Sequence, residues 1–252
     1  MSRLDGGYTA HEQTDHRASF DEGGAVSAPT VASQQPRPAG EVAGVTKRRR
    51  SRWVIPVAAT ACYALFALVV HLRVLDDLDT AVRSASRPGD VWGPLQIRAA
   101  HVAHGLQPAR LALLLLLVVV VVSLLRRSLR PLAVMAVVGV PVAIVTLGTK
   151  YVMAHSDPGT VPVGHGSFPS GHMVSVLIVF GLVVLLLRPR TRWGWIVPAV
   201  VGCLMGCALV LADIHPATDV IGAGLLAVAT LASARAAGLG QWAAMPQADK
   251  AG

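Results

Sequence analysis

Apolar runs long enough to cross a lipid bilayer dominate this sequence of 252 residues. A hydrocarbon core about 30 Å thick requires roughly 20 apolar residues in one helix. Only 14% of the residues are charged, whereas a soluble globular domain has about 25%. We therefore predict an all-α fold, a bundle of six transmembrane helices. Their approximate bounds are residues 53–72, 109–125, 132–149, 170–187, 193–212 and 219–236.

The two ends of the chain lack this apolar pattern. Residues 1–46 are rich in Gly, Ala, Ser, Pro, Gln and charge, and have too few apolar side chains to fold on their own. We predict a disordered cytoplasmic tail there, a membrane domain over residues 47–238, and a cytoplasmic C-terminal tail over residues 239–252. The first apolar run begins far from the N-terminus and is too long for a secretory signal, so we expect the tail to remain on the mature protein.

Clusters of basic residues predict the orientation in an integral plasma membrane protein. They lie at residues 47–52, 126–130 and 188–192, next to three of the apolar runs. Because cytoplasmic loops are enriched in Lys and Arg, both termini are expected in the cytoplasm. The polar stretch at 73–108 is then extracytoplasmic, with part of it as an interfacial helix. The net charge of +8 lies mostly in these short clusters, which favours the lipid bilayer rather than nucleic acid as the partner.

A Pro-Ser-Gly-His segment begins the fourth run, on the extracytoplasmic side. The pair Ser170-Gly171 at a helix start leaves backbone N–H groups aimed outward, where the helix dipole favours an anion such as phosphate. His172 follows on the first turn, where it can donate a proton to a leaving-group oxygen. The alternative is an ordinary serine cap with a histidine nearby.

A second pair of polar residues begins the sixth run on the same side. His215 and Asp219 are four residues apart, so on a helix the carboxylate can hold one imidazole nitrogen while the other faces away. Pro216 suits the first helical position and puts His215 at the helix entrance. A histidine held in this way is a competent nucleophile towards phosphorus. The alternative is an interfacial histidine beside a capping aspartate.

These segments resemble known motifs. Residues 168–172 (Phe-Pro-Ser-Gly-His) and 215–220 (His-Pro-Ala-Thr-Asp-Val) resemble the second and third motifs of the type 2 phosphatidic acid phosphatase and haloperoxidase superfamily, and Lys150 resembles the start of the first motif. The resemblance implies a membrane lipid phosphatase that uses no cofactor and no metal. Its substrate would be a lipid phosphate such as a polyprenyl diphosphate, phosphatidic acid or phosphatidylglycerol phosphate.

The same resemblance implies a role for each candidate residue. His215 would attack phosphorus, Asp219 would orient it, and His172 would protonate the departing lipid alcohol. Water would then hydrolyse the phosphohistidine. Three further groups would stabilise the phosphate oxygens: Lys150, Ser170 and the amide of Gly171.

Two arginines of the family pattern are missing here. The first motif normally runs Lys, six residues, Arg-Pro, but the corresponding pair is Asp157-Pro158, and the Ser-Arg pair that opens the third motif is replaced by Ala208 and Leu209. Removing one well-placed donor costs about 2.7–4 kcal/mol of transition-state stabilisation. One hypothesis is that two protonated histidines of the same outer loop, His155 and His165, compensate in part. The alternative is that both are solvated loop residues.

The sequence is compatible with three functions. The first is an active lipid phosphatase or diphosphatase. The second, favoured by the missing arginines, is a catalytically weak or inactive relative that binds phospholipid headgroups or acts as a scaffold for another membrane protein. The third is a metal-dependent hydrolase that uses His172, His215 and Asp219 as ligands. No oligomeric state follows from the helices.

Overall fold

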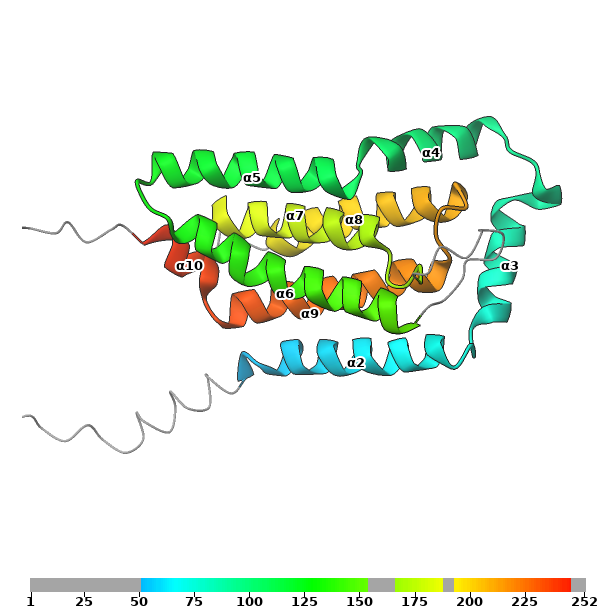
Figure 1. Cartoon of the computed structure of the whole chain (residues 1–252), viewed down its shortest axis with the longest axis horizontal. Helices are drawn as coiled ribbons and strands as arrows, with labels where there is room; N and C mark the ends of the chain where they lie inside the picture. Colours follow the sequence, from blue (N-terminus) through cyan, green and yellow to red (C-terminus); the bar gives the residue numbers. More distant parts are fainter. Residues whose placement is uncertain (1–50, 154–165, 188–192, 246–252) are drawn as a thin grey trace, which may run out of the picture.

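The computed structural model describes residues 51–153, 166–187 and 193–245, and within these ranges all regular structure is helical. The described residues form six long helices, which run side by side along the long axis of the molecule (Figure 1). They are α2 (Val54–His71), α5 (Pro108–Leu125), α6 (Arg130–Met153), α7 (Gly171–Leu187), α8 (Trp193–Leu211) and α9 (Ala217–Ala236). Each begins and ends within a few residues of a predicted span. The predicted N-terminal tail lies outside the described residues.

Four of these helices, α2, α5, α6 and α9, are long and apolar enough to cross a membrane, and α7 and the segment Trp195–Leu211 of α8 are shorter apolar stretches. Many large apolar side chains point away from the bundle, including those of Leu113, Leu124 and Leu125. Such a surface suits lipid rather than water. The chain is therefore a multi-pass membrane protein, and the count of six spans stays a prediction.

Helix α7 lies in the middle of the bundle and packs against α5, α8 and α9. Ten of its 17 residues are buried, as expected for a helix that is apolar on every side. The long helix α2 packs along α9. The first turn of α7 is therefore held on several sides by neighbouring helices.

The polar stretch between α2 and α5 folds into three short elements. They are α3 (Asp76–Ser86), the 3₁₀ helix η1 (Pro88–Asp90) and α4 (Pro94–Gly105). Helix α4 packs against α8, while α3 crosses the end of the bundle and contacts α8 and α9 (Figure 1). The sequence predicted one interfacial helix in part of this stretch, whereas the structure has three helical elements there, two of them packed against the bundle.

At the opposite end of the molecule, the chain after α9 also folds. Residues Leu239–Ala244 form α10, although the sequence assigned them to a C-terminal tail. Arg126 holds this end together, because its guanidinium donates to the carbonyl of Ala243 at 3.2 Å and to that of Leu186 at 2.9 Å. The folded unit therefore extends past residue 238.

Gly222 on α9 allows a close approach of Phe168, the residue that begins the Phe-Pro-Ser-Gly-His segment. A Cβ at Gly222 would lie 2.3 Å from Cε2 of the Phe168 ring, whereas a Cβ at Gly224 would meet no atom within 4 Å. Phe168 is fully buried, and its ring lies 6.3 Å from that of Tyr63 and 6.4 Å from that of Phe66. The ring has little room to move away.

We expect Gly222→Ala to destabilise the protein by about 1–3 kcal/mol, because the added methyl group overpacks a filled core. Gly224→Ala, two residues along the same helix, should leave stability unchanged or raise it by up to about 1 kcal/mol, because alanine favours helix more than glycine. Thermal unfolding midpoints in detergent micelles would compare the two variants. Equal midpoints would contradict this account of the Phe168 contact.

Candidate active site

Three segments that are distant in the sequence meet at one end of the bundle. They are the last turn of α6 with Lys150, the start of α7, and the turn between α8 and α9 (Figure 1). A direct backbone bond joins two of them, because the amide of Ser170 donates to the carbonyl of Asp219 at 3.2 Å. The fold thus brings the two histidine-bearing segments together.

The start of α7 has the geometry of a serine cap. Ser170 is fully buried, and its Oγ accepts a hydrogen bond from the amide of Met173 at 3.3 Å. This bond satisfies one of the free N–H groups of the first turn. The Ser170 hydroxyl therefore supports the helix start.

Lys150 lies beside this helix start. Its Nζ donates to the carbonyl of Ser167 at 2.6 Å and to that of Gly166 at 3.4 Å. Its Cε lies 3.9 Å from the position that a Cβ on Gly171 would take. A positive charge and the N-terminus of α7 therefore lie side by side, and both favour an anion.

His215 is held by a buried carboxylate. Its Nδ1 lies 3.1 Å from Oδ2 of Asp219, which is 0% exposed. The other oxygen, Oδ1, has no hydrogen-bond partner among the described residues. The sequence predicted Pro216 as the first helical residue, but Pro216 is the N-cap, and α9 begins at Ala217. His215 thus precedes the helix and still reaches the carboxylate, which leaves Nε2 on the far side of the ring.

His172 faces His215 across the site. The centroids of the two rings are 6.0 Å apart and the ring planes meet at 62°. At this separation one phosphoryl group can contact a nitrogen of each ring. The pair can therefore supply a nucleophile and a proton donor to the same phosphorus centre.

The sequence did not identify a group of polar residues on α3 and at its C-terminal end that contacts the α8–α9 turn and the first turn of α9. Asp79 accepts hydrogen bonds from Thr218, and Arg83 and Arg87 form ion pairs with Asp213. Asp79, Arg83 and Arg87 are spaced by four residues, a signal that predicts one common helix face. Nothing in the sequence indicates which surface that face meets.

The structure describes only one of the two positions at which the family pattern has an arginine. Leu209 is fully buried, and its carbonyl accepts the amides of Ile214 at 3.0 Å and His215 at 3.4 Å. A core side chain thus occupies one of these positions. The other position, Asp157, lies outside the described residues, as do His155 and His165, so their proposed compensation stays a hypothesis.

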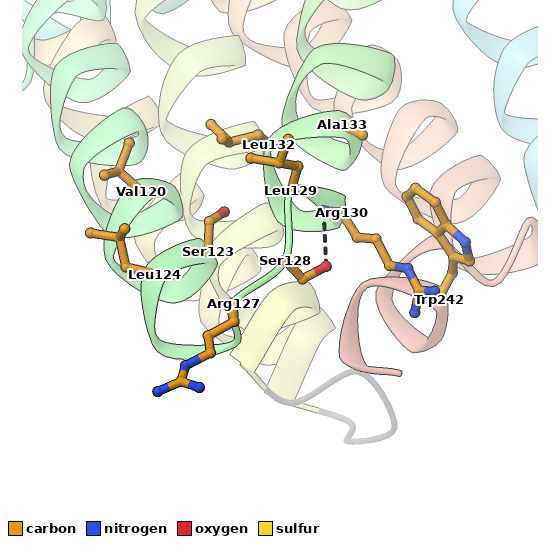
Figure 2. Close-up of a pocket in the computed structure, with 10 residues that line it drawn as sticks. All are labelled: Val120, Ser123, Leu124, Arg127, Ser128, Leu129, Arg130, Leu132, Ala133 and Trp242. Atoms are coloured by element: carbon orange, nitrogen blue, oxygen red, sulfur yellow. Dashed lines mark hydrogen bonds between the residues drawn. The ribbon is translucent and has the colours of Figure 1, made fainter. Parts of the chain in front are cut away.

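Within the described ranges, no group of three or more His, Cys, Asp or Glu side chains is arranged to hold a metal ion. A groove does occur at the end of the bundle opposite the histidines, where α5, α6 and α10 meet (Figure 2). Its lining is mostly apolar, and it includes Arg127, Arg130 and Trp242. The guanidinium of Arg130 lies 5.7 Å from the centre of the Trp242 ring. This groove is remote from the histidines and takes no part in their chemistry.

Comparison with known proteins gives one family match and one similar fold. Residues 141–238 match the model of the PAP2 superfamily, and this range contains the six described candidate residues. Among solved structures, the fold is similar to that of a transmembrane PAP2-type phosphatidylglycerolphosphate phosphatase from Bacillus subtilis. The TM-score is 0.61 and the identity 20%, covering 75% of this chain and 96% of that chain. The search of curated proteins gave no significant match.

Proposed function

We propose that the chain is an integral membrane lipid phosphatase, because its residues 141–238 match the model of the PAP2 superfamily. Its substrate is a phosphomonoester or diphosphate of a lipid. The similar solved structure is described as a phosphatidylglycerolphosphate phosphatase, and phosphatidic acid and polyprenyl diphosphates share the same reacting group. The basic inner turns favour an active site on the extracytoplasmic face, with both termini in the cytoplasm.

The observation that carries this proposal is the arrangement of three side chains. Asp219 holds Nδ1 of His215 at 3.1 Å, and the ring of His172 stands 6.0 Å from that of His215. A carboxylate that orients an imidazole and a second imidazole facing it form a nucleophile and acid pair. The buried carboxylate also stabilises the positive charge that His215 acquires during the reaction.

In the first step, Nε2 of His215 forms a bond to phosphorus while the bond from phosphorus to the lipid oxygen breaks. His172 gives its proton to that oxygen, so a neutral alcohol leaves from a monoester. In the second step, His172 takes a proton from water, and the hydroxide oxygen bonds to phosphorus while the bond from phosphorus to Nε2 of His215 breaks. Inorganic phosphate leaves, and both histidines return to their starting states. Lys150 and the first amides of α7 stabilise the phosphate oxygens in both steps.

Phosphate release from a panel of lipid phosphates tests the proposal. The purified, detergent-solubilised protein is assayed with phosphatidic acid, phosphatidylglycerol phosphate and a polyprenyl diphosphate, each in the presence of EDTA. Release that persists in EDTA, with one phosphoryl group trapped on His215 after rapid quenching, would support the histidine route. Failure of the correctly folded protein to release phosphate from any of them would favour a lipid-binding or scaffold role. Release that EDTA abolishes would favour a metal-dependent hydrolase.

We expect Asp219→Asn to lower kcat by roughly a hundredfold or more, but by less than removal of His215 does, because an orienting carboxylate contributes less than the nucleophile. The variant keeps the size of the buried side chain but loses the charge that stabilises the imidazolium. Initial rates with the best substrate of the panel provide the measurement. A variant with the parent rate would show that Asp219 has only a structural role.

A further inference from the structure

Helix α3 and its C-terminal end present three charged residues to the turn that carries His215. Asp79 and Arg83 lie four residues apart on one face of α3, and Arg87 is the residue that follows the helix at its C-terminal end. All three contact residues between α8 and the first turn of α9, and these contacts fall on both sides of His215.

On the upstream side, two guanidiniums hold one carboxylate. Arg83 lies 3.0 Å and Arg87 2.9 Å from Oδ2 of Asp213. Arg87 is itself fixed, because its side chain is buried, pairs with Asp90 and lies 5.8 Å from the ring of Trp92. Asp213 has a φ of 51°, a left-handed conformation that non-glycine residues seldom adopt. The ion pairs therefore stabilise an unusual backbone two residues before His215.

On the downstream side, Asp79 caps α9 from another helix. Its Oδ1 accepts the backbone N–H of Thr218 at 3.0 Å, and its Oδ2 accepts the Thr218 hydroxyl at 2.5 Å. The N-cap residue of α9, Pro216, makes no side-chain cap bond. Asp79 thus supplies the acceptor that a Ser or Asp cap would normally provide, next to Asp219.

We propose that α3 is a positioning clamp for the catalytic histidine, with Asp79, Arg83 and Arg87 as its positioning residues. The clamp fixes residues 213–218 at both ends, and so keeps Nδ1 of His215 on Asp219 and Nε2 towards the phosphate. This inference rests on the proposed phosphatase function. In this proposal Arg83 and Arg87 position His215. They do not take over the phosphate-binding role expected of the two arginines that are missing from the family pattern.

A clamp and a phosphate-binding site predict different kinetics. If Asp79 and Thr218 only position His215, breaking their contact lowers kcat and leaves KM nearly unchanged, since the substrate is bound but poorly aligned. If α3 bound the substrate instead, the same change would raise KM. Misplacement of a reacting group by about 1 Å reduces rates by roughly a hundredfold.

The test uses Asp79→Ala, Thr218→Val and Thr218→Ser in the full chain, with Asp77→Ala as the matched control. Asp77 is an exposed carboxylate on the same helix. With the best substrate of the panel and EDTA, we expect Asp79→Ala and Thr218→Val to lower kcat by about ten- to a hundredfold with KM within about twofold of the parent value. Thr218→Ser keeps the hydroxyl and should stay within about threefold of the parent kcat, as should Asp77→Ala.

Hydrogen exchange provides a readout that does not depend on activity. The amide of Thr218 and its neighbours at 213–219 should exchange at least about tenfold faster in Asp79→Ala than in the parent, while amides of the α5–α6 turn keep their rates. If the parent releases no phosphate but this local change occurs, the contact stands and the proposed function fails. The clamp proposal would be overturned if Asp79→Ala kept both the amide exchange rates and the kcat of the parent. It would also be overturned if Asp79→Ala raised KM and left kcat unchanged. Should Asp79→Ala not fold, Thr218→Val against Thr218→Ser decides the question.

Discussion

Replacing His215 with alanine is expected to reduce phosphate release by about 10⁴-fold or more, because the proposed covalent intermediate forms on this imidazole. Nδ1 of His215 lies 3.1 Å from the buried carboxylate of Asp219, and the ring of His172 lies across the site. Among the described residues, no other histidine combines these two neighbours. The rate of phosphate release in EDTA with the best substrate provides the measurement.

His71→Ala serves as the control, because His71 is an exposed histidine at the end of α2. Its rate should equal that of the parent. Removal of the imidazole leaves the buried Asp219 without its partner and so can destabilise the protein. Size-exclusion elution and the thermal unfolding midpoint therefore serve to check that the His215 variant is folded. A folded His215→Ala protein that retains more than about one hundredth of the parent rate would exclude the phosphohistidine route.

Replacing His172 should give a defect that depends on the leaving group. With a lipid alcohol, which leaves poorly without a proton, we expect His172→Ala to lower kcat by about 10²- to 10⁴-fold, the range that general acid catalysis contributes. With p-nitrophenyl phosphate, whose phenolate leaves without protonation, the loss in the step that releases the phenolate should be at least about tenfold smaller.

Burst kinetics isolate that first step, because p-nitrophenolate appears before the phosphohistidine is hydrolysed. His215→Ala is the comparison, and its loss should be equally large with both substrates. An equal defect of His172→Ala with both leaving groups would assign His172 to phosphate binding or to the shape of the site instead of proton donation.

The sequence predicted the long helices well because the lipid imposes a strong and simple requirement. Each membrane-crossing helix needs a continuous apolar run, and α5, for example, was expected at residues 109–125 and extends from Pro108 to Leu125. The placement of His172 and His215 at the same end of the bundle was also expected, because basic turns predict the side on which each helix begins. Local patterns thus sufficed wherever one physical constraint dominated.

Contacts between distant polar segments could not be predicted in this way. The spacing of Asp79, Arg83 and Arg87 indicates a common face, but a pattern along one helix does not identify the surface that the face meets. The fold of α10 was missed for a similar reason, since Gly240 and Ala243 become buried only against other helices. Pro216 was placed one residue too far into its helix, because proline is most frequent at the first helical position and here it is the N-cap.

The site draws on more of the chain than the matched domain. The rings of Tyr63 and Phe66 on α2 lie against Phe168, and α3 contacts the turn before α9. Both helices precede residue 141, where the family match begins. A fragment cut at that boundary would retain the two histidines and the aspartate and lose the surfaces that align them. The smallest part of the chain that can form this site therefore starts at α2. Exchanging the site between relatives requires exchanging α2 and the segment that contains α3 as well.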